Sequence, residues 1–131
     1  MPGFRSPQAV LLVEDPETSA AFFARLGFRE AFRTPSSGPP IHVDVALDGV
    51  RLGLAARRSV EEDHGLSATT GPGRAAVVVW TDDVRADVAA FEAEGVPVLQ
   101  PPGPWLGRLL IAWLADPDGH LVQLVQEVEG P

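Results

Sequence analysis

The sequence predicts an α+β fold made of two copies of a strand–helix–three-strand unit (βαβββ), and two observations carry that prediction. First, the order of apolar runs, helix signals and turn signals in the N-terminal half recurs in the C-terminal half. Second, the spacing recurs: Asp15 stands twelve residues before Gly27, and Asp83 stands twelve residues before Gly95. A repeated helix of one length with the same turns on either side fits two modules better than a single copy.

The first module is predicted at residues 8–56. The apolar run from Gln8 to Glu14 predicts a buried strand. Asp15 followed by Pro16 predicts the start of a helix, and Gly27 predicts its end. Three further strands are predicted, the last two joined by a tight hairpin at Asp48-Gly49: residues 28–34, 41–47 and 50–55.

The second module is predicted at residues 74–127. It begins with an apolar strand at 75–80, and its helix is predicted between Asp83 and Gly95. Three strands then follow, with Asp118-Gly119 as the last hairpin turn: residues 96–100, 109–115 and 120–127. The segment 57–73, with Pro72 and three glycines, is predicted to be the loop that joins the modules into a single domain, 1–131.

Composition excludes several classes of function. The net charge of −8 argues against a nucleic-acid partner, because binding to phosphates needs clustered Lys and Arg. No apolar run is long enough to span a membrane, so no membrane partner is expected. There is no cysteine to act as thiolate nucleophile or ligand, and residues 1–6 have no signal-peptide core, so a cytoplasmic location is expected.

Three short motifs lie in a recognisable order around the repeat. They are Val13–Asp15 (VED), Ala21–Phe28 (AFFARLGF) and Asp116–His120 (DPDGH). Together they resemble the vicinal oxygen chelate superfamily, which includes glyoxalases, extradiol dioxygenases and bleomycin-resistance proteins. The resemblance covers residues 8–126, and it implies two βαβββ modules that form a curled mixed sheet around a cleft. It also implies a homodimer.

The resemblance implies where family enzymes would hold a metal ion, namely on the first and last strands of each module. The matching positions in this sequence are Gln8, Gly53, Ala76 and Gln123. A divalent transition metal needs imidazole, carboxylate or thiolate ligands, and none of these four residues offers one. We therefore expect no metal and no cofactor, and the sequence is closest in character to the metal-free antibiotic-binding members.

Side chains that alternate along the strands give the expected ligand-binding residues. On the cleft face we place Gln8, Val10 and Leu12 of the first strand, and we expect a small organic ligand to contact seven residues from three strands: Gln8, Val10, Leu12, Ala76, Val78, Trp80 and Gln123. Trp80 either stacks on a planar ligand or fills the barrel.

Trp105 is the other tryptophan expected to contact a ligand. It lies in 101–108, a stretch too rich in proline for a helix or a central strand and therefore predicted to be a loop. An exposed tryptophan on such a loop either covers the cleft as a lid or packs on a dimer partner.

The histidines have separate interpretations. His42 and Asp44 are two residues apart on a strand, so they share a face, where they either orient a proton acceptor toward a ligand or form a satisfied structural pair. His64 is predicted to be solvated in the connecting loop. His120 follows the last hairpin glycine and is predicted to be structural.

The leading hypothesis is a metal-independent protein that binds a small molecule such as a drug or antibiotic, similar to bleomycin-resistance proteins. The acidic charge would favour a cationic ligand, and the tryptophans a planar one. The alternative is an isomerase or lyase of the same superfamily acting without the usual metal ligands, with His42, Asp44 or His64 as acid or base. A metal-dependent glyoxalase or dioxygenase is disfavoured.

Overall fold

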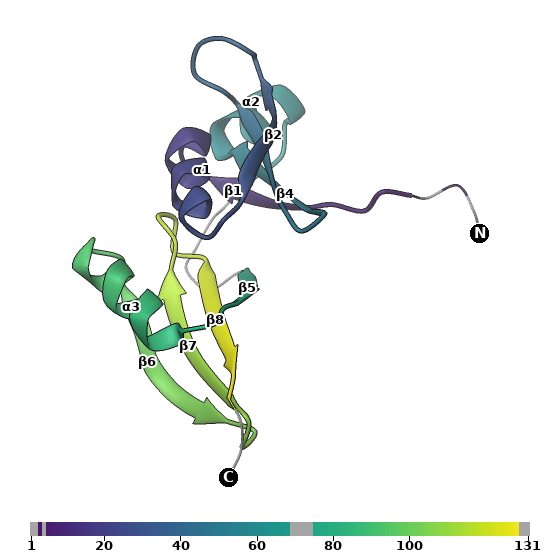
Figure 1. Cartoon of the computed structure of the whole chain (residues 1–131). Coiled ribbons are helices and arrows are strands. Elements are labelled where there is room, and N and C mark those ends of the chain that lie inside the picture. The colour runs from purple at the N-terminus through teal and green to yellow at the C-terminus, as the bar shows by residue number, and fades with distance from the viewer. Residues whose placement is uncertain (1–2, 4, 69–74, 129–131) are drawn as a thin grey trace. The chain divides into compact units, whose positions relative to one another are not determined.

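The computed structural model describes residues 3, 5–68 and 75–128, and it consists of two compact units, Met1–Thr70 and Gly71–Pro131 (Figure 1). Each unit contains one four-stranded mixed sheet with a helix packed on it. The α+β class and the two βαβββ modules predicted from the sequence are therefore confirmed. The shared cleft and the single-domain organisation stay predictions.

The first unit has the predicted order of elements, followed by an additional helix. Its elements are β1 (Ala9–Val13), α1 (Pro16–Arg25), β2 (Arg29–Thr34), β3 (His42–Leu47), β4 (Val50–Ala56) and α2 (Arg57–His64). The strands pair in the order β1-β4-β3-β2, with β1 parallel to β4 and the other pairs antiparallel. At the β3–β4 turn both Asp48 and Gly49 have positive φ, as a tight type I′ hairpin requires.

The second unit repeats this topology. Its elements are β5 (Ala76–Trp80), α3 (Val84–Ala93), β6 (Val98–Trp105), β7 (Leu109–Ala115) and β8 (Leu121–Glu127). The strands pair in the order β5-β8-β7-β6, again with only the first pair parallel. The order and the directions of the strands match those of the first unit, so the internal repeat is structural as well as sequential.

Equivalent aspartates start the two main helices. The side chain of Asp15 accepts a hydrogen bond from the amide of Glu17 at 3.0 Å, and that of Asp83 accepts one from the amide of Ala86 at 3.0 Å. These bonds satisfy amides that have no partner within the helix. Gly27 and Gly95 have positive φ just beyond the helix ends, where a side chain would be strained.

Each unit has its own apolar core between the sheet and its main helix. In the first unit α1 packs on β2, β3 and β4, and in the second α3 packs on β6, β7 and β8. The core residues that are at least 98% buried include Val13, Phe23, Val43, Val45 and Leu54 in the first unit and Val84, Ala112, Leu114, Val122 and Leu124 in the second. Burying a side chain such as Phe23 contributes about 1.5–3 kcal/mol.

The segment that follows the first module was predicted wrongly. Residues 57–64 form helix α2 rather than the start of a loop. The helix ends at Gly65, in the left-handed conformation, and Arg57 and Arg58 each face a glutamate four residues later. The charged residues interpreted as a solvated loop are therefore the polar face of a short helix. Residues 69–74 lie outside the described residues.

The proline-rich stretch was also predicted wrongly. The strand expected at 96–100 is β6, which runs from Val98 to Trp105 and so includes most of the expected loop. Three prolines are tolerated because β6 is the edge strand of its sheet and its register against β7 shifts twice. An edge strand has one side on which no amide hydrogen is needed.

None of the helices in the described part of the chain has the length and apolar character that a membrane span requires.

Candidate functional site

In the first unit, the sheet face opposite the α1 core carries four of the nine predicted ligand-binding residues: Gln8, Val10, Leu12 and His42. Along β1, Leu11 and Val13 are buried while Val10 is 46% exposed and Leu12 is half-buried. Val10 lies beside Gly53 of β4 in the parallel pair. The predicted alternation therefore places Val10 and Leu12 away from the core.

Asp44 is the centre of a polar cluster on this face. One carboxylate oxygen accepts a hydrogen bond from Nε2 of Gln8 at 2.7 Å and lies 2.6 Å from Nε2 of His42. The other oxygen lies 3.2 Å from Nε of Arg51. Asp44 itself is buried, and Phe32 packs its ring against that of His42 with centroids 6.4 Å apart. The cluster joins side chains from β2, β3 and β4 with Gln8, which directly precedes β1.

The cluster packs closely around Gly53. A Cβ atom at that position would lie 3.0 Å from Nε2 of Gln8, 3.0 Å from Val10 and 3.2 Å from the Asp44 carboxylate. The room that a ligand-bearing side chain would need at position 53 is thus taken by its neighbours.

The residues of the cluster do not fit a divalent ion. The amide nitrogen of Gln8 already binds Asp44, and the guanidinium of Arg51 neutralises the same carboxylate. A cation brought to Asp44 would meet a fixed positive charge 3.2 Å from the oxygen it needs.

A hollow of about 740 Å³ lies beside the cluster. Gln8 and Arg51 line it together with Ser6, Pro7 and the hairpin residues next to Arg51. Its volume lies within the range of small-molecule sites. The hollow therefore brings one predicted ligand-binding residue, Gln8, together with a charged side chain that was not predicted.

The corresponding face of the second unit is apolar. Gln123 lies between Val78 of β5 and Trp113 of β7 in the sheet. Gln123 is only 9% exposed. Val78 is 52% exposed and Trp80 59% exposed. Trp113 was expected from the sequence to lie in the core, but it shares the face of Gln123 and is half-buried.

The tryptophans at the ends of the strands are exposed. Trp80 lines a hollow of about 490 Å³ together with residues that follow it and with Gln126 and Glu127 of β8. Trp105, paired with Leu109 at the end of β6, is half exposed. Ala76 is also exposed, so it offers a small surface and no donor.

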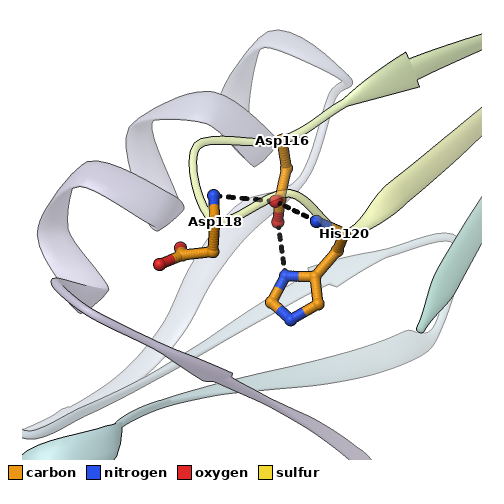
Figure 2. A group of neighbouring side chains, drawn as sticks. All are labelled: Asp116, Asp118 and His120. Carbon is orange, nitrogen blue, oxygen red and sulfur yellow. Dashed lines mark hydrogen bonds and ion pairs between the residues drawn. The ribbon is translucent and has the colours of Figure 1, made fainter. Parts of the chain in front are cut away.

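A second group of polar side chains lies in the turn between β7 and β8, as Figure 2 shows. One oxygen of Asp116 accepts hydrogen bonds from the amides of Asp118 at 2.9 Å and His120 at 2.7 Å, and the other lies 2.9 Å from Nδ1 of His120. Ligand atoms of these three residues lie within 4.8 Å of one another. Because Asp116 is buried and both its oxygens are already bound, the group fits a structural turn, as predicted for His120.

The structure also adds residues that the sequence reasoning missed. Arg51 and Phe32 share the face of Asp44, and strand alternation relative to Gly53 and Asp44 could have found both. His64 ends α2 and is exposed, so it takes no part in the cluster.

Comparison with known proteins gives a match at the level of a family. Residues 5–124 match the model of the Glyoxalase/Bleomycin resistance protein/Dioxygenase superfamily. A lactoylglutathione lyase of Schizosaccharomyces pombe is 29% identical over 143 residues, which cover 95% of this chain. The chain spans 45% of the length of that curated relative.

Solved structures share the fold. A hypothetical protein from S. aureus has a TM-score of 0.77 at 24% identity and covers 95% of both chains. TioX from Micromonospora sp. ML1 has a TM-score of 0.72 at 24% identity, with 92% of this chain and 97% of its own covered.

Proposed function

We propose that this chain, which belongs to the glyoxalase/bleomycin resistance protein/dioxygenase superfamily, is a metal-independent binding protein for a small organic molecule such as a drug or antibiotic. The observation that carries the proposal is the chemistry at the four positions where the resemblance implies metal ligands. They are occupied by Gln8, Gly53, Ala76 and Gln123, none of which bears a carboxylate or imidazole. In the first unit the space at position 53 is filled by the neighbouring side chains.

The exposed apolar side chains support binding of a planar molecule. Trp80 presents a half-exposed indole next to Val78, and stacking on an indole is worth about 0.5–1.5 kcal/mol beyond the area buried. The side chain of Gln123, next to Val78 in the sheet, could offer an amide to the ligand. An apolar wall with few polar groups is the common composition of small-molecule sites.

The net charge of −8 would raise the encounter rate with a cationic ligand. It sets no preference among neutral molecules. We therefore propose planar drugs with a positive charge as the first ligands to test.

The test is quenching of tryptophan fluorescence by bleomycin-like and quinone-type drugs, with and without a chelator. All three tryptophans lie in the second unit, so the signal reports on that face. We expect saturable quenching that a chelator leaves unchanged and that Trp80→Phe weakens several-fold. Trp105→Phe is the matched variant, and it shows how much of the fluorescence quenching comes from the tryptophan at the end of β6. Binding that is lost with the chelator, or a purified protein holding one equivalent of metal, would contradict the proposal.

A second candidate is an isomerase or lyase of the same superfamily that works without the usual metal, and one contact favours it. Asp44 lies 2.6 Å from Nε2 of His42, an arrangement that can hold an imidazole as a general base. The curated relative is a lactoylglutathione lyase, so formation of lactoylglutathione is the reaction to assay first. Turnover in metal-free buffer that disappears in His42→Ala would favour the enzyme over the binding protein.

The homodimer implied by the family resemblance is part of the proposal. Sedimentation equilibrium would give the mass of a pair of 13.9 kDa chains if it is correct.

A further inference from the structure

We infer that the hollow beside Gln8 and Arg51 recognises a neutral carboxamide or lactam group, and that Asp44 is the positioning residue that sets this preference. The inference rests on the proposed function, because it names the chemical group that the first unit would take from the ligand. It depends only on contacts within that unit.

The first step concerns which atom of Gln8 is available. Nε2 of Gln8 donates to the Asp44 carboxylate at 2.7 Å. A carboxylate only accepts hydrogen bonds, so the amide cannot turn over without bringing its oxygen against another oxygen. Oε1 of Gln8 takes no part in this contact, so it remains as an acceptor that a ligand can use.

The second step concerns Arg51. Its Nε lies 3.2 Å from the other Asp44 oxygen, which ties one edge of the guanidinium to the cluster. Nη2 of Arg51 also donates to the carbonyl oxygen of Ala31, at 3.5 Å. The side chain is still 48% exposed, and no bond from Nη1 to another described residue is recorded, so Nη1 is the nitrogen that can donate to a ligand in the hollow. Arg51 thus supplies donors next to the acceptor of Gln8.

An acceptor beside a donor is complementary to a group that carries both. A primary or secondary amide offers an N–H to Gln8 and a carbonyl oxygen to Arg51. A carboxylate offers no donor, and an amidinium offers no acceptor and would meet the positive charge of Arg51. The hollow of about 740 Å³ leaves room for the rest of a small molecule.

The same carboxylate also fixes His42. If Asp44 accepts from Nε2 of His42 at 2.6 Å, the neutral ring carries its proton on Nε2 and leaves Nδ1 as an acceptor. The tautomer of His42, measured by NMR, therefore tests the orienting role of Asp44 without any ligand. His64, exposed at the end of α2, is an internal reference in the same spectrum.

The experiment is an NMR titration of the ¹⁵N-labelled full chain with three probes of similar size. Benzamide carries a donor and an acceptor, N,N-dimethylbenzamide carries only the acceptor, and benzamidinium carries only donors. We expect benzamide to shift the side-chain signals of Gln8 and Arg51 and to bind about three- to tenfold more tightly than either other probe, the effect of one hydrogen bond. Equal affinities, or no shift at Gln8 with benzamide, would overturn the inference.

The variants test the positioning role. Asp44→Asn is nearly the same size but can also donate, so it should remove the preference for benzamide and release His42 from the Nε2–H tautomer. Glu62→Gln also replaces a carboxylate with an amide, but on the exposed side of α2. It should leave the preference for benzamide and the tautomer of His42 unchanged. A wild-type His42 found in the Nδ1–H tautomer would overturn the inference without any ligand or variant.

The two proposals can fail separately. Loss of tryptophan quenching concerns the second unit and the proposed function, whereas the amide preference is read at Gln8 and Arg51. Benzamide that binds no better than its dimethyl analogue would leave metal-independent binding standing and remove only the inferred amide specificity.

Discussion

Replacing Asp116 with alanine should be among the most destabilising single changes in the second unit. The carboxylate accepts three hydrogen bonds, two from backbone amides and one from the His120 ring, and the aspartate is 4% exposed. A buried donor left without a partner costs about 1–3 kcal/mol. His120 is buried, so its two donors bear the full cost, while the amide of the half-buried Asp118 can reach water. We expect a loss of about 3–4 kcal/mol.

Urea unfolding followed by tryptophan fluorescence is the appropriate assay, because every tryptophan lies in the same unit as Asp116. Asp116→Asn keeps one oxygen that accepts from the two backbone amides, and its NH2 group can donate to Nδ1 of His120 once that nitrogen is deprotonated. We expect this variant to lose only about 1 kcal/mol of unfolding free energy. Asp82→Ala, at an exposed position of the same unit, is the control and should be nearly neutral.

The reasoning would be refuted by an Asp116→Ala protein that loses less than about 1 kcal/mol, since the two buried donors of His120 left without a partner cannot cost so little. It would also be refuted if a chelator destabilised the wild-type protein as much as the mutation does. That result would mean that the Asp116, Asp118 and His120 group holds a cation.

Three further predictions concern the rest of the fold. Gly53→Ala should lower the free energy of unfolding by about 1 kcal/mol, measured by circular dichroism in urea, because its Cβ would approach three neighbours to 3.0–3.2 Å; a neutral result would show that they yield freely. Asp15→Ala and Asp83→Ala should each cost about 1 kcal/mol through the lost helix cap and should be rescued by Asn; a failure of that rescue would count against capping. The hydrogen bond from Arg33 lowers the pKa of Glu30 from its ordinary value of 4.5. Any stability that this bond contributes is therefore present above pH 4.5 and is lost as the pH falls through the lowered pKa. An NMR titration in which Arg33→Gln leaves the pKa of Glu30 low would contradict this cause.

The repeat could be predicted from the sequence because its signals are local. A capping aspartate, a glycine beyond the helix and an Asp-Gly hairpin each act within a few residues, and Asp15, Gly27 and Asp48 all behave as expected. The residues that alternate along β1 were likewise assigned to the correct face. These features depend on neighbours in the chain, which a sequence displays.

The errors and the missed residue have separate causes. The prolines of β6 argued against a strand, but an edge strand tolerates them, and whether a strand is at the edge is a property of the pairing order. Helix α2 is short and highly charged, so its sequence was interpreted as a solvated loop. Arg57 and Arg58 instead form ion pairs along the helix. The role of Arg51 was missed because it depends on a contact with Asp44 of the adjacent strand.

The two sheets have the same topology, but equivalent positions on them hold side chains of different chemistry. Gly53 lies opposite Asp44 across β3 and β4, and the matching pair across β7 and β8 is Gln123 opposite Trp113. In the first unit Gly53, which has no side chain, leaves room for the carboxylate of Asp44 on the adjacent strand. In the second the amide sits beside an indole. Since a buried carboxylate needs donors and an indole needs an apolar surface, the two faces differ in the chemical groups that would suit them. A molecule that has a carboxamide but no planar ring should therefore shift Gln8 without quenching tryptophan fluorescence, and a planar molecule without an amide should do the reverse.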